Sequence, residues 1–200
     1  MALPMTKNLK RLLFYFVYIL LVWGSFRFFA RLPEVVDELW FKPVIWLTPL
    51  IWWRFSFPKK LDFFDGGLLP AILWGLAGGL VYFVILRSLT GAGFVFSINT
   101  TGVALATAVV EELVFSGFIL GLLVAETKKE NVSLGLTALG FALIHLPINL
   151  FVFHLPVVAL AGAFLLAFFV ALINGFLRLR SNNVLSAILA HFIYLVIVLS

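Results

Sequence analysis

The sequence has no cysteine among its 200 residues, and charged residues make up only 12% of it. The absence of cysteine excludes disulfide bonds, thiolate metal sites and a cysteine nucleophile. Charged residues account for about a quarter of an average soluble domain. The shortage of charge therefore argues against a chain that exposes most of its surface to water.

Hydrophobic residues, in contrast, supply 64% of the chain, against about half in a soluble domain. Such an excess needs an apolar solvent, and the lipid bilayer provides one. The 23 phenylalanines and 6 tryptophans are typical of lipid-facing and interfacial surfaces. We predict an all-α, polytopic transmembrane helix bundle, folded as a single integral membrane domain over residues 1–200, with membrane lipid as a partner.

Seven apolar segments are candidates to cross the membrane, because a transmembrane helix needs about twenty such residues. The second segment is short and carries Lys42 and two prolines, so it could either cross or re-enter. Charged and turn-forming residues lie between the segments, and they predict a loop over Arg31–Glu38. The seven segments cover residues 11–30, 40–53, 66–86, 101–124, 132–149, 155–177 and 184–199.

Most basic residues fall on one side of the membrane if all seven segments cross. The positive-inside rule assigns that side to the cytoplasm and predicts a cytoplasmic N-terminus. The net charge of +5 then needs no nucleic-acid partner, and we expect the cytoplasmic membrane of a bacterium or archaeon as the location. The basic residues on that side are Lys7, Lys10, Arg11, Arg54, Lys59, Lys60, Lys128, Lys129, Arg178 and Arg180.

Two adjacent carboxylates, Glu111 and Glu112, lie near the middle of the fourth segment. One ionised side chain at a helix centre costs about 2.5–3.5 kcal/mol on insertion scales, and such residues usually have a function. Successive helical residues point about 100° apart, so we expect one glutamate to face a cavity and the other to brace a neighbouring helix. The alternative is a protonated carboxyl that only holds two helices together.

Two histidines lie in other apolar segments, His145 in the fifth and His191 in the seventh. Either one alone is more typical of a buried structural histidine. Together with a carboxylate at similar depth they can activate a water molecule. Glu111, His145 and His191 could also hold a divalent metal such as zinc, with a position left for water.

The sequence lacks the signals of zinc, serine and aspartyl intramembrane proteases. The sequence contains no His-Glu-x-x-His zinc motif. Ser116 precedes a glycine but lacks the loop context of a serine protease, and Asp37, Asp62 and Asp65 are expected in loops. Asn174, near the end of the sixth segment, is interpreted as a helix-end hydrogen-bonding residue.

Three short motifs resemble those of the CAAX protease and bacteriocin-processing family, also called CPBP or Abi, which includes relatives of the Rce1-type prenyl protease. The family motifs are Glu-Glu-x-x-x-Arg, Phe-x-x-x-His and His-x-x-x-Asn, and the resemblance covers roughly residues 103–196. The corresponding residues are Glu111, Glu112 and Ser116 in the first motif, Phe141 and His145 in the second, and His191 and Leu195 in the third.

The resemblance implies an intramembrane endopeptidase that cuts near the C-terminal end of a membrane-associated or lipidated protein, or of a sorting-tail substrate. It implies Glu111 as the general base that activates water, with His145 assisting it or binding a metal. His191 would serve an oxyanion site or a metal, and Glu112 would brace the bundle or tune Glu111. It leaves glutamate-type and zinc-type catalysis both open.

Two positions depart from the family pattern. Ser116 stands in place of an arginine, which removes a partner for a buried carboxylate and implies that one glutamate is protonated. Leu195 stands in place of an asparagine, which removes an oxyanion donor. Asn149 or Tyr194 could supply that donor instead, and we count both with Phe141 and Ser116 as supporting residues.

Two other functions remain open from the sequence. One is a catalytically inactive membrane scaffold or immunity-type protein of the same fold. The other is a small proton-coupled transporter in which Glu111 or Glu112 carries the proton, although no internal repeat supports it. The protease hypothesis requires Glu111, His145 and His191 to converge on one cavity.

Overall fold

The computed structural model describes residues 6–30, 32–56, 63–90 and 97–199, and these residues form helices joined by short connections, with no strand among them. The prediction of an all-α bundle is confirmed. Two segments, η1 and η2, are π-helical. The elements are α1 (Lys7–Phe29), α2 (Glu34–Val36), η1 (Asp37–Phe41), α3 (Lys42–Ser56), α4 (Leu68–Thr90), α5 (Ile98–Glu112), η2 (Leu113–Ile119), α6 (Leu120–Thr127), α7 (Glu130–Ile144), α8 (Leu146–Phe151), α9 (Val157–Ser181) and α10 (Val184–Val198).

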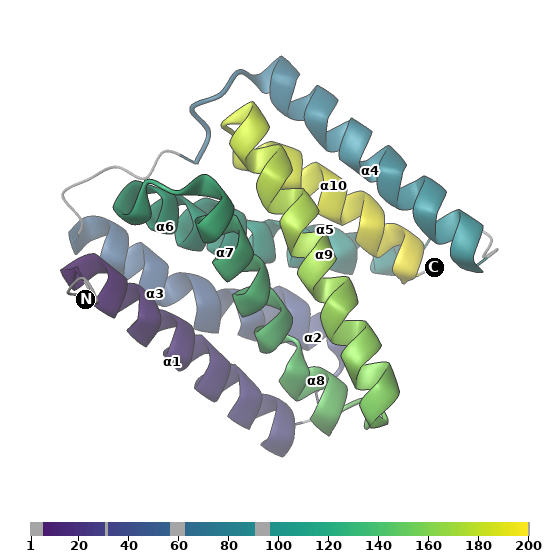
Figure 1. Ribbon diagram of the computed structural model, residues 1–200. Helices are drawn as coiled ribbons and strands as arrows, with labels where there is room; N and C mark the ends of the chain where they lie inside the picture. The colour runs from purple at the N-terminus through teal and green to yellow at the C-terminus, as the bar shows by residue number, and fades with distance from the viewer. Residues whose placement is uncertain (1–5, 31, 57–62, 91–96, 200) are drawn as a thin grey trace.

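Five helical stretches are long and apolar enough to cross a membrane, which confirms a polytopic membrane protein. The helix α10 is apolar but shorter. The helix α3 has 15 residues and is therefore only about 22 Å long; it packs along α1, where the hydroxyl of Tyr15 donates to the carbonyl of Trp46 (2.8 Å; Figure 1). The five long stretches are Lys7–Phe29, Leu68–Ser88, Ile98–Thr127, Glu130–Phe151 and Val157–Ser181.

The predicted loop over Arg31–Glu38 is wrong in its second half. The segment from Glu34 to Phe41 is helical, and Asp37 and Glu38 are buried in it. Their charges are typical of a loop in sequence, but in the fold they pair with Arg27 and Lys42. Ion pairing removes the need for water at these carboxylates, so the chain can stay helical.

The two central helical stretches are interrupted near the predicted site residues. A π-helical segment, η2, directly follows Glu112, and π-helical turns are frequent at functional sites. The predicted fifth segment breaks at His145, where α7 ends and α8 begins. Pro147 explains the break, because proline lacks the amide hydrogen that would continue the helical pattern.

One end of the bundle brings together the start of α1, the end of α6 and the turn between α9 and α10. Thr6 donates to Glu126, and the backbone amide of Val184 donates to the carbonyl of Phe63. The start of α1 and the turns at residues 126–133 and 181–184 therefore lie toward one end of the bundle (Figure 1). The basic residues of these segments are predicted from the sequence to lie on one side of the membrane. The cytoplasmic orientation of this end stays a prediction, and Lys59 and Lys60 lie outside the described residues.

Candidate active site

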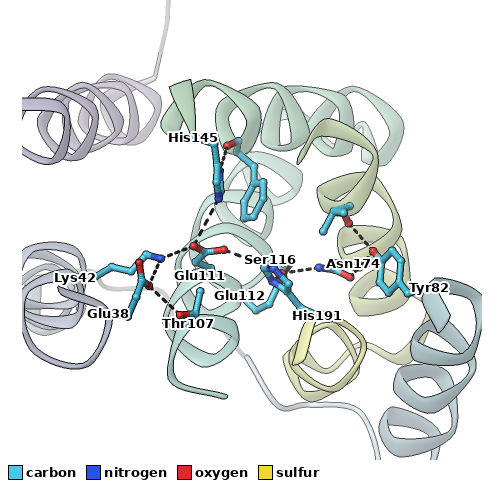
Figure 2. A network of polar contacts seen from close by, with 12 residues as sticks. Glu38, Lys42, Tyr82, Thr107, Glu111, Glu112, Ser116, His145, Asn174 and His191 are labelled. Carbon is cyan, nitrogen blue, oxygen red and sulfur yellow. Dashed lines mark hydrogen bonds and ion pairs between the residues drawn. The ribbon is translucent and has the colours of Figure 1, made fainter. Parts of the chain in front are cut away.

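Glu111 is a buried carboxylate on α5 that faces both histidines. Its Oε1 lies 3.8 Å from Nε2 of His145, and its Oε2 lies 3.7 Å from Nε2 of His191. The ammonium of Lys42 donates to Oε1 across 2.5 Å (Figure 2). Three helical elements distant in sequence thus meet at one carboxylate, and the convergence that the protease hypothesis requires is present.

His145 lies at the break between α7 and α8, and its ring orientation follows from two contacts with the preceding turn. Its Nδ1 donates to the carbonyl of Phe141 (2.8 Å), because a carbonyl can only accept. The ring also packs on the Phe141 ring at 4.5 Å between centroids. Because Nδ1 carries the hydrogen, Nε2 of the neutral ring can only accept a hydrogen bond. This nitrogen lies on the side of the ring that faces Glu111.

Glu112 is also buried, but it faces a different set of partners. Nδ1 of His191 and Nδ2 of Asn174 each donate to its Oε1 across 2.7 Å. The hydroxyl of Ser116, one helical turn later, donates to its Oε2. All of these groups are donors to a carboxylate, so Glu112 holds His191 in place while Nε2 of that ring points to Glu111.

Asn174 is a site residue that sequence reasoning missed. The interpretation as a helix-end residue is wrong, because α9 continues to Ser181 and Asn174 is completely buried. Its Oδ1 accepts a hydrogen bond from the hydroxyl of Tyr82 (2.9 Å), so the amide links α4 and α9 to Glu112 on α5. The signal that could have identified it was a polar amide side chain within an apolar helix.

A second group of missed residues, on η1, α3 and the preceding turn of α5, is linked to Glu111 through Lys42. The Glu38 carboxylate accepts from Lys42 (2.5 Å), Arg27 (3.0 Å) and Thr107 (2.9 Å). Arg27 also pairs with Asp37. The expectation that Ser116 leaves a buried carboxylate without its partner is therefore corrected, since Lys42 on another helix pairs with Glu111.

A cavity of about 290 Å³ opens beside these polar groups. It brings together the expected residues Phe141, Asn149, Tyr194 and Leu195, whereas Glu112 and Ser116 lie outside its lining. The His145 side chain is 28% exposed, but those of Glu111 and His191 are 2–3% exposed, so His145 is the most exposed of these three residues. The remaining lining residues are Glu38, Val103, Thr107, Glu111, His145, Ile148, Phe153, Ala163, Leu166, Ala167, Val170, His191, Val198 and Leu199.

The arrangement does not fit a divalent metal such as zinc. Within the described ranges, no group of three or more His, Cys, Asp and Glu side chains is placed to hold a metal ion. The Lys42 ammonium already occupies Oε1 of Glu111, and a positive charge there opposes a dication.

Comparison with known proteins identifies one family. A model of the family described as "Type II CAAX prenyl endopeptidase Rce1-like" matches residues 93–197, which is more than half of the chain. No curated protein and no solved structure matches the chain. The matched region contains the two glutamates, both histidines and Asn174, whereas Glu38 and Lys42 precede it.

Proposed function

Because the chain belongs to the Rce1-like family of type II CAAX prenyl endopeptidases, we propose that it hydrolyses a peptide bond of a membrane-associated protein in the cavity beside Glu111. The observation that carries the proposal is that each oxygen of the Glu111 carboxylate faces an imidazole Nε2, at 3.8 Å for His145 and 3.7 Å for His191. Polar atoms at such separations are commonly bridged by a water molecule.

In the proposed reaction, a water molecule between Glu111 and His145 is the nucleophile. Nε2 of His145 accepts one hydrogen bond from it and orients it, while Glu111 takes its proton as general base. The water oxygen adds to the scissile carbonyl carbon. The proton on Glu111 then passes to the leaving nitrogen as the C–N bond breaks, so a carboxylic acid and an amine are released.

His191 is proposed to stabilise the negative charge that develops on the carbonyl oxygen. In its protonated form it donates from Nδ1 to Glu112 and from Nε2 toward the cavity. Preorganised donors of this kind can supply about 2.7–4 kcal/mol of transition-state stabilisation. Glu112 is a positioning residue in this scheme, because it contacts His191 and does not line the cavity.

The cavity lining favours an apolar substrate segment. Apart from the polar groups around Glu111, it consists mainly of aliphatic and aromatic side chains from α8, α9 and α10. A substrate anchored in the membrane can present such a segment at this depth. We propose cleavage near the C-terminal end of a lipidated or membrane-anchored protein, or of a sorting tail.

An inactive scaffold of the same fold is the second candidate, because Leu195 gives the cavity an aliphatic side chain at the position of the family's asparagine. Cleavage assays in lipid nanodiscs distinguish the two. The probes are a peptide with a farnesylated Cys-aliphatic-aliphatic-X end and an unprenylated peptide with an apolar anchor. We expect the wild-type protein to cleave at least one of them.

The variants Glu111→Gln, His145→Ala and His191→Ala should each lose activity by about 100-fold or more, while still inserting and folding. Glu130→Gln is the matched control, because Glu130 is an exposed glutamate at the start of α7. Full cleavage by Glu111→Gln would exclude the proposed base. Correct insertion with no cleavage of either probe by the wild type would favour the scaffold.

A further inference from the structure

The contact between Lys42 and Glu111 joins two parts of the chain that only the fold brings together. Lys42 begins α3 and precedes the family-matched region, whereas Glu111 lies within it. The Lys42 ammonium lies 2.5 Å from Oε1 of Glu111 and 2.5 Å from Oε2 of Glu38. The N-terminal part of the bundle therefore contributes the cation that contacts the proposed general base.

Lys42 contacts Glu111 but is not among the residues that line the substrate cavity. Glu38, Thr107 and Glu111 line that cavity, and the Lys42 side chain is buried. Because Glu38 and Glu111 already bind the ammonium, we expect no direct contact between it and a substrate in the cavity. Any role in hydrolysis has to act through Glu111.

Glu38 in turn keeps Lys42 in place. Its carboxylate accepts from Lys42, Arg27 and Thr107, so it is anchored to α1 and α5 as well as to α3. An ammonium held by two carboxylates has little freedom to rotate away. Buried ion pairs of this kind add little net stability when compared with apolar packing, so a role in stabilising the fold alone does not explain the charged groups gathered in this region.

We propose that Lys42 is a positioning residue for hydrolysis, which holds the Glu111 side chain as a carboxylate with Oε2 directed at His191 and the cavity. This inference rests on the proposed function, because it assigns Lys42 a role through the general base. It places the complete active site on both the family-matched region and the preceding helices η1 and α3.

Three variants separate positioning from stability. Lys42→Met should lower kcat about 30-fold or more with KM within about threefold, because the apolar substrate contacts stay intact. Glu38→Gln with Lys42→Met removes one charge of each sign, which should return the melting temperature toward wild type without returning kcat. Asp37→Asn is the matched control, since it changes a neighbouring buried carboxylate whose ion pair is with Arg27 and leaves the bond from Arg27 to Glu38 available, and its kcat should stay within about threefold of wild type.

If kcat recovers together with the melting temperature in Glu38→Gln/Lys42→Met, the role of Lys42 is structural and the inference is overturned. A similar loss of kcat in the Asp37→Asn control would overturn it as well. The proposed function fails by a different result, namely full cleavage by Glu111→Gln.

A labelling experiment tests the inference without any cleavage assay. Dicyclohexylcarbodiimide reacts with protonated carboxyl groups in apolar surroundings, and mass spectrometry locates the product. Glu111 should stay unlabelled in the wild type, where the ammonium pairs with it, and become labelled in Lys42→Met, because an unpaired buried carboxylate takes up a proton. Equal labelling of Glu111 in both proteins would contradict the inference.

Discussion

Nδ1 of His191 lies 2.7 Å from Oε1 of Glu112, so an imidazole on α10 is held by a carboxylate on α5. A ring held on one nitrogen presents the other in a fixed direction, here toward Oε2 of Glu111 at 3.7 Å. The adjacent glutamates therefore have separate sets of partners. Glu111 borders the cavity, and Glu112 orients a residue that borders it.

The first prediction concerns this pair. Glu112→Gln and His191→Ala should each lower kcat by about 100-fold, and the double variant should be little worse than either one, because the two side chains act as a unit. A double-mutant cycle on the cleavage rate measures the coupling. Strictly additive losses would show that Glu112 acts independently of His191.

The second prediction concerns Asn174. Replacement by leucine removes the amide that donates to Glu112 and accepts from Tyr82. Loss of hydrogen bonds to a buried charged group should lower the free energy of unfolding by about 1–3 kcal/mol, measured by thermal or denaturant unfolding in detergent. Tyr82→Phe is the control, because it leaves the hydrogen bond from Asn174 to Glu112 in place, and it should cost less. A larger decrease in the free energy of unfolding for Tyr82→Phe than for Asn174→Leu would contradict the prediction.

The third prediction concerns the missing family asparagine. Asn149 lines the cavity together with Leu195, and we expect its amide to donate to the oxyanion. Asn149→Ala should lower kcat about 10-fold to 100-fold, and Leu195→Asn in that background should restore part of the loss. Unchanged cleavage by Asn149→Ala would remove this residue from the mechanism. Tyr194→Phe tests the other lining donor in the same assay.

The fourth prediction concerns metal independence. The Lys42 ammonium on Oε1 of Glu111 and the absence of a metal-ligand group in the described part of the chain favour hydrolysis by the carboxylate itself. Cleavage should therefore persist after dialysis against EDTA and in the presence of 1,10-phenanthroline. Loss of activity that returns on adding zinc would establish a metal-dependent mechanism.

The fifth prediction concerns the close packing of α4 on α10. A Cβ atom at Gly75 would lie 2.8 Å from Cβ of Leu189 and 2.9 Å from the carbonyl oxygen of Ser186, so Gly75→Ala should separate the two helices. The melting temperature should fall, because the free energy of unfolding should decrease by about 1–3 kcal/mol. Gly162→Ala on α9 is the control, because a Cβ atom added there would meet no neighbouring helix within 4 Å. Equal melting temperatures of Gly75→Ala and Gly162→Ala would contradict the close packing of α4 on α10.

The N-terminal helices show where sequence reasoning stopped short. Asp37 and Glu38 follow Arg31 and Pro33 in a charged stretch, and in sequence such a stretch is typical of a loop. Their burial depends on Arg27 and Lys42, which lie on the flanking helices. Glu38 and Lys42 are four residues apart, but the contact of Lys42 with Glu111 joins residues 69 apart along the chain, and no local pattern contains it.

The sequence by itself determined the helical membrane bundle, because long apolar runs need lipid and a lipid-exposed backbone must satisfy its hydrogen bonds within helices. It also identified both glutamates and both histidines, since polar groups in apolar runs are costly and therefore conspicuous. Only the tertiary structure decided which glutamate faces the cavity and which partners each one has. The reason is that the rotation of each helix about its axis, and the approach of Lys42 and Asn174 from 69 and 62 residues away, are set by packing between helices and not by local sequence.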